Sequence, residues 1–111
     1  KMVEVVGGVE GRICVIVDDM IDTGGTIVKA AETLFEAGAS EVVVAATHGI
    51  FSEPAVQRLS DSRISRVLVT DSLPIPAESR FAKLEVLSIA PLIAKAINEV
   101  FTEGSVTGIF E

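Results

Sequence analysis

The sequence predicts an α/β fold, in which helices flank a parallel sheet in a Rossmann-like domain. Two observations lead to this prediction. Short apolar runs of strand length alternate along the chain with segments whose apolar residues recur at helical spacing. The apolar runs are also continuous, which is typical of parallel strands buried on both faces. We therefore expect a parallel sheet that is covered by helices on both faces.

The first strand and the first helix are assigned from a continuous apolar run and from the helical spacing of apolar residues that follows it. Residues 13–17 form a continuous apolar run, as expected of a buried strand. The period changes to that of a helix at Gly25, and Gly38 is a suitable helix end. Between these glycines, one helical face carries the apolar residues Ile27, Ala31, Leu34 and Phe35.

The later elements continue the alternation. Residues 42–46 are expected to form the second strand, and Pro54 marks the start of the second helix. Residues 66–69 and 85–89 are assigned to the third and fourth strands. Pro91 opens a third helix. Its apolar stripe, which we expect to lie in the core, is Ile93, Ala96, Ile97 and Val100.

The composition limits the class of protein. The chain has 111 residues, about the size of one domain, and 49% of them are hydrophobic, which is enough for a core. No apolar run approaches the ~18 residues of a membrane span, so we expect no membrane contact. The net charge of -7 argues against a nucleic-acid partner. Cys14 is the single cysteine, which excludes an internal disulfide bond and fits a cytoplasmic location.

Residues 17–26, with the sequence VDDMIDTGGT, carry the most information about function. They follow the first predicted strand, and ligands of parallel sheets bind beyond the carboxyl ends of strands. Gly24 and Gly25 let the backbone approach a phosphate closely. The N–H groups at the start of the next helix favour an anion, and Thr23 and Thr26 add hydroxyl donors. The polar segments 47–49 and 70–72 are expected at the same edge of the sheet.

The three acids in this stretch need a partner other than the phosphate, which would repel them. Vicinal sugar hydroxyls can donate hydrogen bonds to Asp18 and Asp19, while Asp22 can position the turn or accept a hydrogen bond from water. A magnesium ion held by substrate oxygens would offset the repulsion further. The stretch therefore predicts a sugar-phosphate site. The simpler alternatives are an acidic strand end followed by a helix cap, or the acid-bearing strand ends of a response-regulator receiver domain.

Several motifs resemble known families. The VDDMIDTGGT stretch resembles the phosphoribosyl-diphosphate loop of the type I phosphoribosyltransferase fold. Other segments resemble ribose-phosphate pyrophosphokinase, the phosphoribosyl-diphosphate synthetase family: Gly11-Arg12, ATHGIFS at 46–52, DSLPI at 71–75 and SVTGIF at 105–110. Two positions depart from that family. Glu53 stands where Gly is frequent, and Asp71 stands where Asn is common.

The resemblance implies an enzyme that transfers the diphosphoryl group of ATP to ribose 5-phosphate, with magnesium, and releases AMP. Asp18 and Asp19 would bind the ribose hydroxyls directly or through magnesium. The phosphate would be held by Asp22, Thr23, Gly24, Gly25 and Thr26. Residues 1–111 would be part of the carboxy-terminal domain, without the amino-terminal domain and the basic catalytic loop. The chain alone is therefore expected to contain no catalytic residue and to be inactive, whereas the whole enzyme is expected to form a homo-oligomer, a hexamer.

Some assignments stay open at this stage. Ser105, Val106 and Thr107 resemble positions that contact a regulatory phosphate or ADP, but an exposed edge strand explains them equally well. His48 is either a catalytic base or, as we favour, a hydrogen-bonded structural residue. Lys83 and Arg80 are interpreted as solvated cations. The alternative functions are a base-specific phosphoribosyltransferase, which shares the loop, and a non-catalytic regulatory subunit associated with the synthetase.

Overall fold

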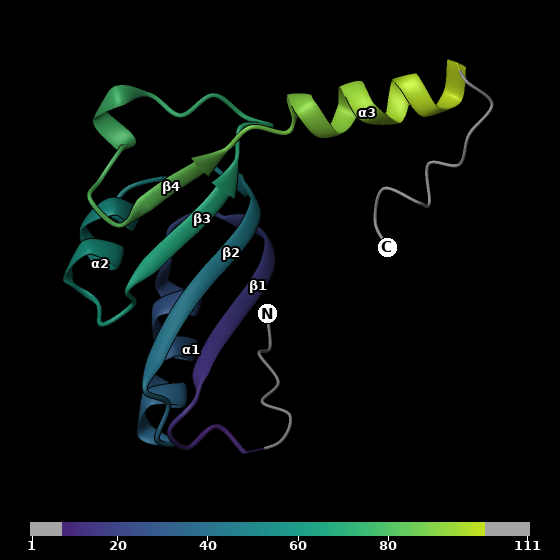
Figure 1. The fold of residues 1–111 in the computed structure, drawn as a ribbon. Coiled ribbons are helices and arrows are strands. Elements are labelled where there is room, and N and C mark those ends of the chain that lie inside the picture. Colours follow the sequence, from purple (N-terminus) through teal and green to yellow (C-terminus); the bar gives the residue numbers. More distant parts are fainter. Residues whose placement is uncertain (1–7, 102–111) are drawn as a thin grey trace.

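Four parallel strands form one sheet in the computed structural model, and they follow one another in chain order (Figure 1). The structure describes residues 8–101, apart from the side chain of residue 101. The strands are β1 (Ile13–Ile21), β2 (Glu41–Gly49), β3 (Arg66–Thr70) and β4 (Leu84–Leu87). The helices are α1 (Gly25–Glu36), α2 (Ala55–Asp61) and α3 (Ala90–Phe101), with a 3₁₀ turn, η1, at Ala77–Ser79. The predicted α/β fold is therefore confirmed.

The first two strands continue further than the apolar runs predict. Parallel pairing extends to Met20 opposite His48 and to Ile21 opposite Gly49. The polar side chains of Asp18, Asp19 and His48 do not end the strands, because the pairing is made by the backbone. Asp18 and Asp19 consequently lie inside β1, where the sequence predicts a loop.

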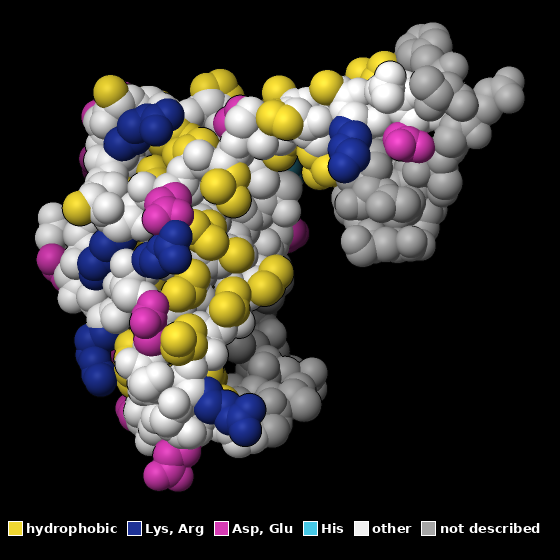
Figure 2. All heavy atoms as spheres, in the orientation of Figure 1, with side chains coloured by type: hydrophobic (Ala, Val, Ile, Leu, Met, Phe, Trp, Pro, Cys, Tyr) yellow, Lys and Arg dark blue, Asp and Glu magenta, His cyan; other side chains and the backbone are white. Residues whose placement is uncertain are grey.

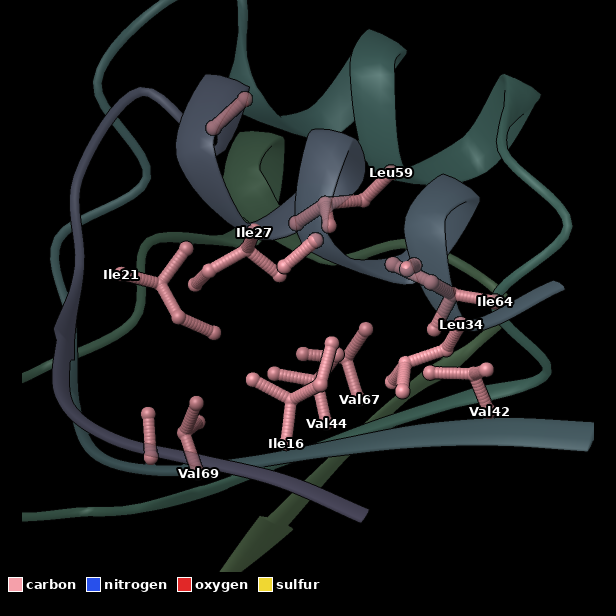
Figure 3. Close-up of a cluster of buried hydrophobic side chains, with 14 of the residues drawn as sticks. Ile16, Ile21, Ile27, Leu34, Val42, Val44, Leu59, Ile64, Val67 and Val69 are labelled. Carbon is pink, nitrogen blue, oxygen red and sulfur yellow. The ribbon is translucent and has the colours of Figure 1, made fainter. Parts of the chain in front are cut away.

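One face of the sheet packs against α1 and α2. Valines of the strands point toward leucine and isoleucine side chains of the two helices (Figure 3). Val42, Val44 and Val67 are completely buried, as are Leu59 and Ile64. The helical spacing predicted for α1 is also confirmed. Its buried residues are Ile27, Ala30, Ala31 and Leu34.

The opposite face of the sheet is open to solvent in the described part of the chain. Ile13, Val15 and Val17 of β1 are 64%, 57% and 78% exposed, and Leu87 of β4 is 53% exposed. Hydrophobic side chains gather on this face in Figure 2. The prediction of cover on both faces is wrong for residues 8–101. When strands follow chain order, crossover connections of one hand place the connecting helices on the same face of the sheet.

Helix α3 extends away from the sheet (Figure 1). Its apolar residues Ile93, Ile97 and Val100 are 49%, 51% and 64% exposed, so the prediction that this stripe lies in the core is wrong for the described residues. The period of the stripe is helical, as predicted, but the period alone does not identify what the apolar face packs against. None of the helices among residues 8–101 combines the length and the apolar character that a membrane span needs.

We expect Leu59→Ala to lower the free energy of unfolding by about 2–5 kcal/mol, because it leaves a cavity where α2 meets the sheet. Leu73→Ala is the control, since Leu73 is 38% exposed. The control should change the free energy by no more than about 0.5 kcal/mol. Urea denaturation measures both values, and similar losses in the two variants would contradict the assigned core.

Candidate functional site

The predicted polar segments meet at the carboxyl edge of the sheet. Because β1, β2 and β3 are parallel, their last residues share this edge. Asp18 and Asp19 lie near the end of β1, and a short turn at residues 22–24 leads directly into α1. The acids and the start of the helix are therefore brought together by one continuous segment.

A cavity of about 170 Å³ opens beside this segment. This volume is below the roughly 300–1,000 Å³ typical of drug-sized ligands, and it suits a phosphate or part of a sugar phosphate. Among the residues predicted to bind the sugar phosphate, Gly25 is the one that does not line the cavity. The lining residues are Asp18, Asp19, Met20, Asp22, Thr23, Gly24, Thr26 and Ile27.

The amino terminus of α1 offers backbone donors at the cavity. The first helical hydrogen bond runs from the Val28 N–H to the Gly24 carbonyl oxygen, at 2.9 Å. The N–H groups of Gly25, Thr26 and Ile27 therefore have no acceptor within the helix. No side chain caps this terminus, and its first turn contains no acidic residue. These donors and the helix dipole together make a site that favours an anion.

Gly24 in the turn and Gly25 at the start of α1 are glycine for different structural reasons. Gly24 has φ 79° and ψ -4°, a left-handed conformation that favours glycine. It also packs against α2, where an added Cβ would lie 3.7 Å from the Leu59 Cγ. At Gly25, an added Cβ would lie 3.0 Å from the Arg58 Nη1. The sequence explains both glycines by close approach of a phosphate, whereas the structure relates each of them to α2.

The two acids of β1 sit in different environments. Asp18 is half-buried and its Oδ1 accepts a hydrogen bond from the Asp19 N–H at 2.7 Å, while Asp19 is exposed. Adjacent residues of a strand point to opposite faces, yet both acids line the cavity at the end of β1. No group of three or more His, Cys, Asp or Glu side chains suited to a metal is found among residues 8–101. Two carboxylates fit magnesium only where substrate oxygens and water complete its ligands.

His48 belongs to a polar network that joins the ends of β2 and β3. Its Nδ1 lies 2.7 Å from the Ser72 Oγ. The Thr70 hydroxyl donates to the Thr47 carbonyl oxygen at 2.6 Å and also contacts the Ser72 Oγ at 3.0 Å. These bonds favour the structural role predicted for His48, because they hold neighbouring strand ends together.

Two cations near α2 have contacts that the sequence does not reveal. Lys83 donates hydrogen bonds to the carbonyl oxygens of Leu59, Ser60 and Ser62, at 3.1, 2.9 and 2.7 Å. The prediction that Lys83 is simply solvated is therefore wrong, since it caps the end of α2. Arg58 donates from Nη1 to the carbonyl oxygen of a distant residue, Thr23, at 3.3 Å. No local pattern signals either contact, because the partners lie more than twenty residues apart.

The predicted regulatory positions cannot be placed. Ser105, Val106 and Thr107 lie outside the residues that the structure describes.

Comparison with known proteins identifies the family of the chain and agrees with the fold. The sequence model of a family described as the phosphoribosyl synthetase-associated domain matches residues 1–111. A ribose-phosphate pyrophosphokinase of Streptomyces avermitilis is 58% identical over 108 residues, which are 97% of this chain and 33% of that protein. One of Mycobacterium leprae is 56% identical over 107 residues, 96% of this chain and 33% of the relative.

A solved structure is similar as well. The crystal structure of phosphoribosylpyrophosphate synthetase from Mycobacterium smegmatis superposes with a TM-score of 0.80 and 54% sequence identity. The match covers 89% of this chain and 33% of that one. The chain thus spans about a third of the length of the relatives that it matches.

We expect Gly24→Ala to lower the free energy of unfolding by about 1–2 kcal/mol, the cost of a left-handed conformation for a residue with a Cβ. Gly25→Ala is the matched control, because its backbone φ lies outside the left-handed region. Thermal unfolding monitored by circular dichroism compares the two. A Gly24→Ala protein as stable as the control would contradict this explanation of the first glycine.

Proposed function

The chain belongs to the phosphoribosyl synthetase-associated domain family, and on this basis we propose that it supplies the ribose 5-phosphate site of a ribose-phosphate pyrophosphokinase. That enzyme would transfer a diphosphoryl group from ATP to the 1-hydroxyl of ribose 5-phosphate and release AMP. The proposal is supported by the relatives' names and by the high identity over almost the whole chain.

One observation carries the assignment of the site: an uncapped helix terminus and two carboxylates line the same small cavity. The N–H groups of Gly25, Thr26 and Ile27 would bind the phosphate, because each lacks a helical acceptor. Asp18 and Asp19 would accept hydrogen bonds from the ribose hydroxyls. A sugar phosphate satisfies both halves of the site, since its charge and its hydroxyls lie at different ends of the molecule.

The same arrangement determines what the chain's residues do during the reaction. Hydrogen bonds at both ends of the sugar would fix the direction of its 1-hydroxyl toward ATP. Phosphoryl-type transfers depend mainly on such positioning and on the stabilisation of charge. Magnesium would supply charge neutralisation when bound. Asp18 and Asp19 are the residues that would contact it, directly or through water.

Other parts of the machinery would lie outside the chain. The chain spans about a third of its relatives, and we place the amino-terminal domain and the basic groups that stabilise the diphosphate in the remaining length. The open sheet face and the exposed apolar residues of α3 support burial against further protein. We propose a cytoplasmic homo-oligomer, with a hexamer as the expected state. The intact acid and glycine set favours this enzyme over the regulatory subunit.

We expect Asp18→Asn, in the complete gene product, to raise the KM for ribose 5-phosphate by roughly tenfold or more, because a charged hydrogen-bond acceptor is lost. The KM for ATP should stay within about twofold, because this carboxylate is assigned to the sugar and not to the nucleotide. Asp61→Asn is the control, since Asp61 lies at the end of α2 and bonds to Gln57. AMP release measures both constants. Equal effects on the two substrates, or no effect, would contradict the assigned role.

A further inference from the structure

We propose that Arg58 is a positioning residue for the phosphate of ribose 5-phosphate. It would act on the turn between β1 and α1, through the Thr23 carbonyl group, without contacting the sugar. This inference rests on the proposed function of the turn and adds a residue from a different helix to it.

The contact joins two segments that are 35 residues apart in the sequence. Arg58 lies on α2, and its Nη1 donates to the Thr23 carbonyl oxygen at 3.3 Å. The Thr23 carbonyl and the Gly24 N–H belong to one planar trans peptide, so they point in opposite directions. Holding this carbonyl toward α2 therefore also fixes the direction of the Gly24 N–H, at a residue that lines the cavity.

The ordinary explanation for a basic residue near the end of a helix does not apply to Arg58. Arg58 lies in the last turn of α2, where a cation commonly binds the free carbonyl groups. In this structure, Lys83 already binds the carbonyl oxygens of Leu59, Ser60 and Ser62. Arg58 instead reaches across to the turn, so its contact with Thr23 needs a separate reason.

Gly25 supplies an independent observation. Its backbone conformation does not require glycine, because its φ lies outside the left-handed region. An added Cβ would, however, lie 3.0 Å from the Arg58 Nη1 and 3.7 Å from the Cζ. The absence of a side chain at Gly25 thus leaves room for the guanidinium beside the first residue of α1.

The contact between Arg58 and the Thr23 carbonyl oxygen also favours a bound anion electrostatically. A carbonyl oxygen repels a nearby phosphate, because both carry negative charge. A guanidinium that binds this oxygen offsets its partial negative charge. The cation also lies one peptide away from the uncapped N–H groups of α1. Arg58 is exposed, so this contribution is moderated by solvent and by salt.

The test uses Arg58→Gln in the complete gene product, with Arg63→Gln as the matched control. Arg63 is also exposed and loses the same charge, but it stacks on the Phe35 ring at 4.0 Å and does not touch the turn. Isothermal titration calorimetry gives the Kd for ribose 5-phosphate, and AMP release gives KM and kcat. We expect Arg58→Gln to raise the Kd and the KM by roughly fivefold to tenfold.

The other measured quantities distinguish a positioning role of Arg58 from a general loss of structure or activity. The kcat, the KM for ATP and the melting temperature should change little in Arg58→Gln, and every constant should change little in Arg63→Gln. If the wild type is active and Arg58→Gln binds ribose 5-phosphate as well as Arg63→Gln does, the inference is overturned and the proposed function stands. If the wild type neither binds ribose 5-phosphate nor forms product, both are overturned.

Gly25→Ala provides a second variant that keeps Arg58 in the chain. Its Cβ should displace the guanidinium from Thr23 and weaken ribose 5-phosphate binding without loss of stability. In an Arg58→Gln background the same substitution should weaken binding much less, because there is no guanidinium left to displace. Additive effects of the two substitutions, or unchanged binding in a folded Gly25→Ala protein, would contradict the inference.

Discussion

The left-handed turn at Gly24, held against α2, is the constraint on which the site depends. It lets β1 pass directly into α1, so the acids at the strand end and the free N–H groups of the helix line one cavity. A residue with a Cβ would resist this conformation, and a looser connection would separate the two halves of the site. The packing of Gly24 near Leu59 links this turn to the core, so the geometry of the ligand site and the stability of the fold share residues.

This arrangement would allow an acidic protein to bind an anion. The chain carries a net charge of -7, and three of its acids lie in the segment that would hold a phosphate. Backbone donors and the helix dipole do not change the net charge, and they act only over the first turn of the helix. In the proposed site the carboxylates are not needed to hold the phosphate and would accept hydrogen bonds from hydroxyl groups. Arg58 adds a cation on the far side of the turn, behind the backbone that faces the ligand.

The fold and the content of the site were largely predictable from the sequence, because both depend on local patterns. The apolar period identified α1, and the order of acids, threonines and glycines identified six of the eight residues that line the cavity. Long-range contacts were not predictable in this way: Arg58 with Thr23, and Lys83 with the end of α2, join segments without any shared motif. The open sheet face was also missed, because an apolar strand pattern indicates burial without identifying the partner that provides it.

A crystal structure of the complete gene product with ribose 5-phosphate bound would test the central claim most directly. The account predicts phosphate oxygens within about 2.7–3.2 Å of the backbone nitrogens at the start of α1, including Gly25 and Thr26. It also predicts the ribose hydroxyls beside Asp18 and Asp19. A phosphate bound elsewhere, or a sugar bound with its hydroxyls away from both acids, would contradict the account.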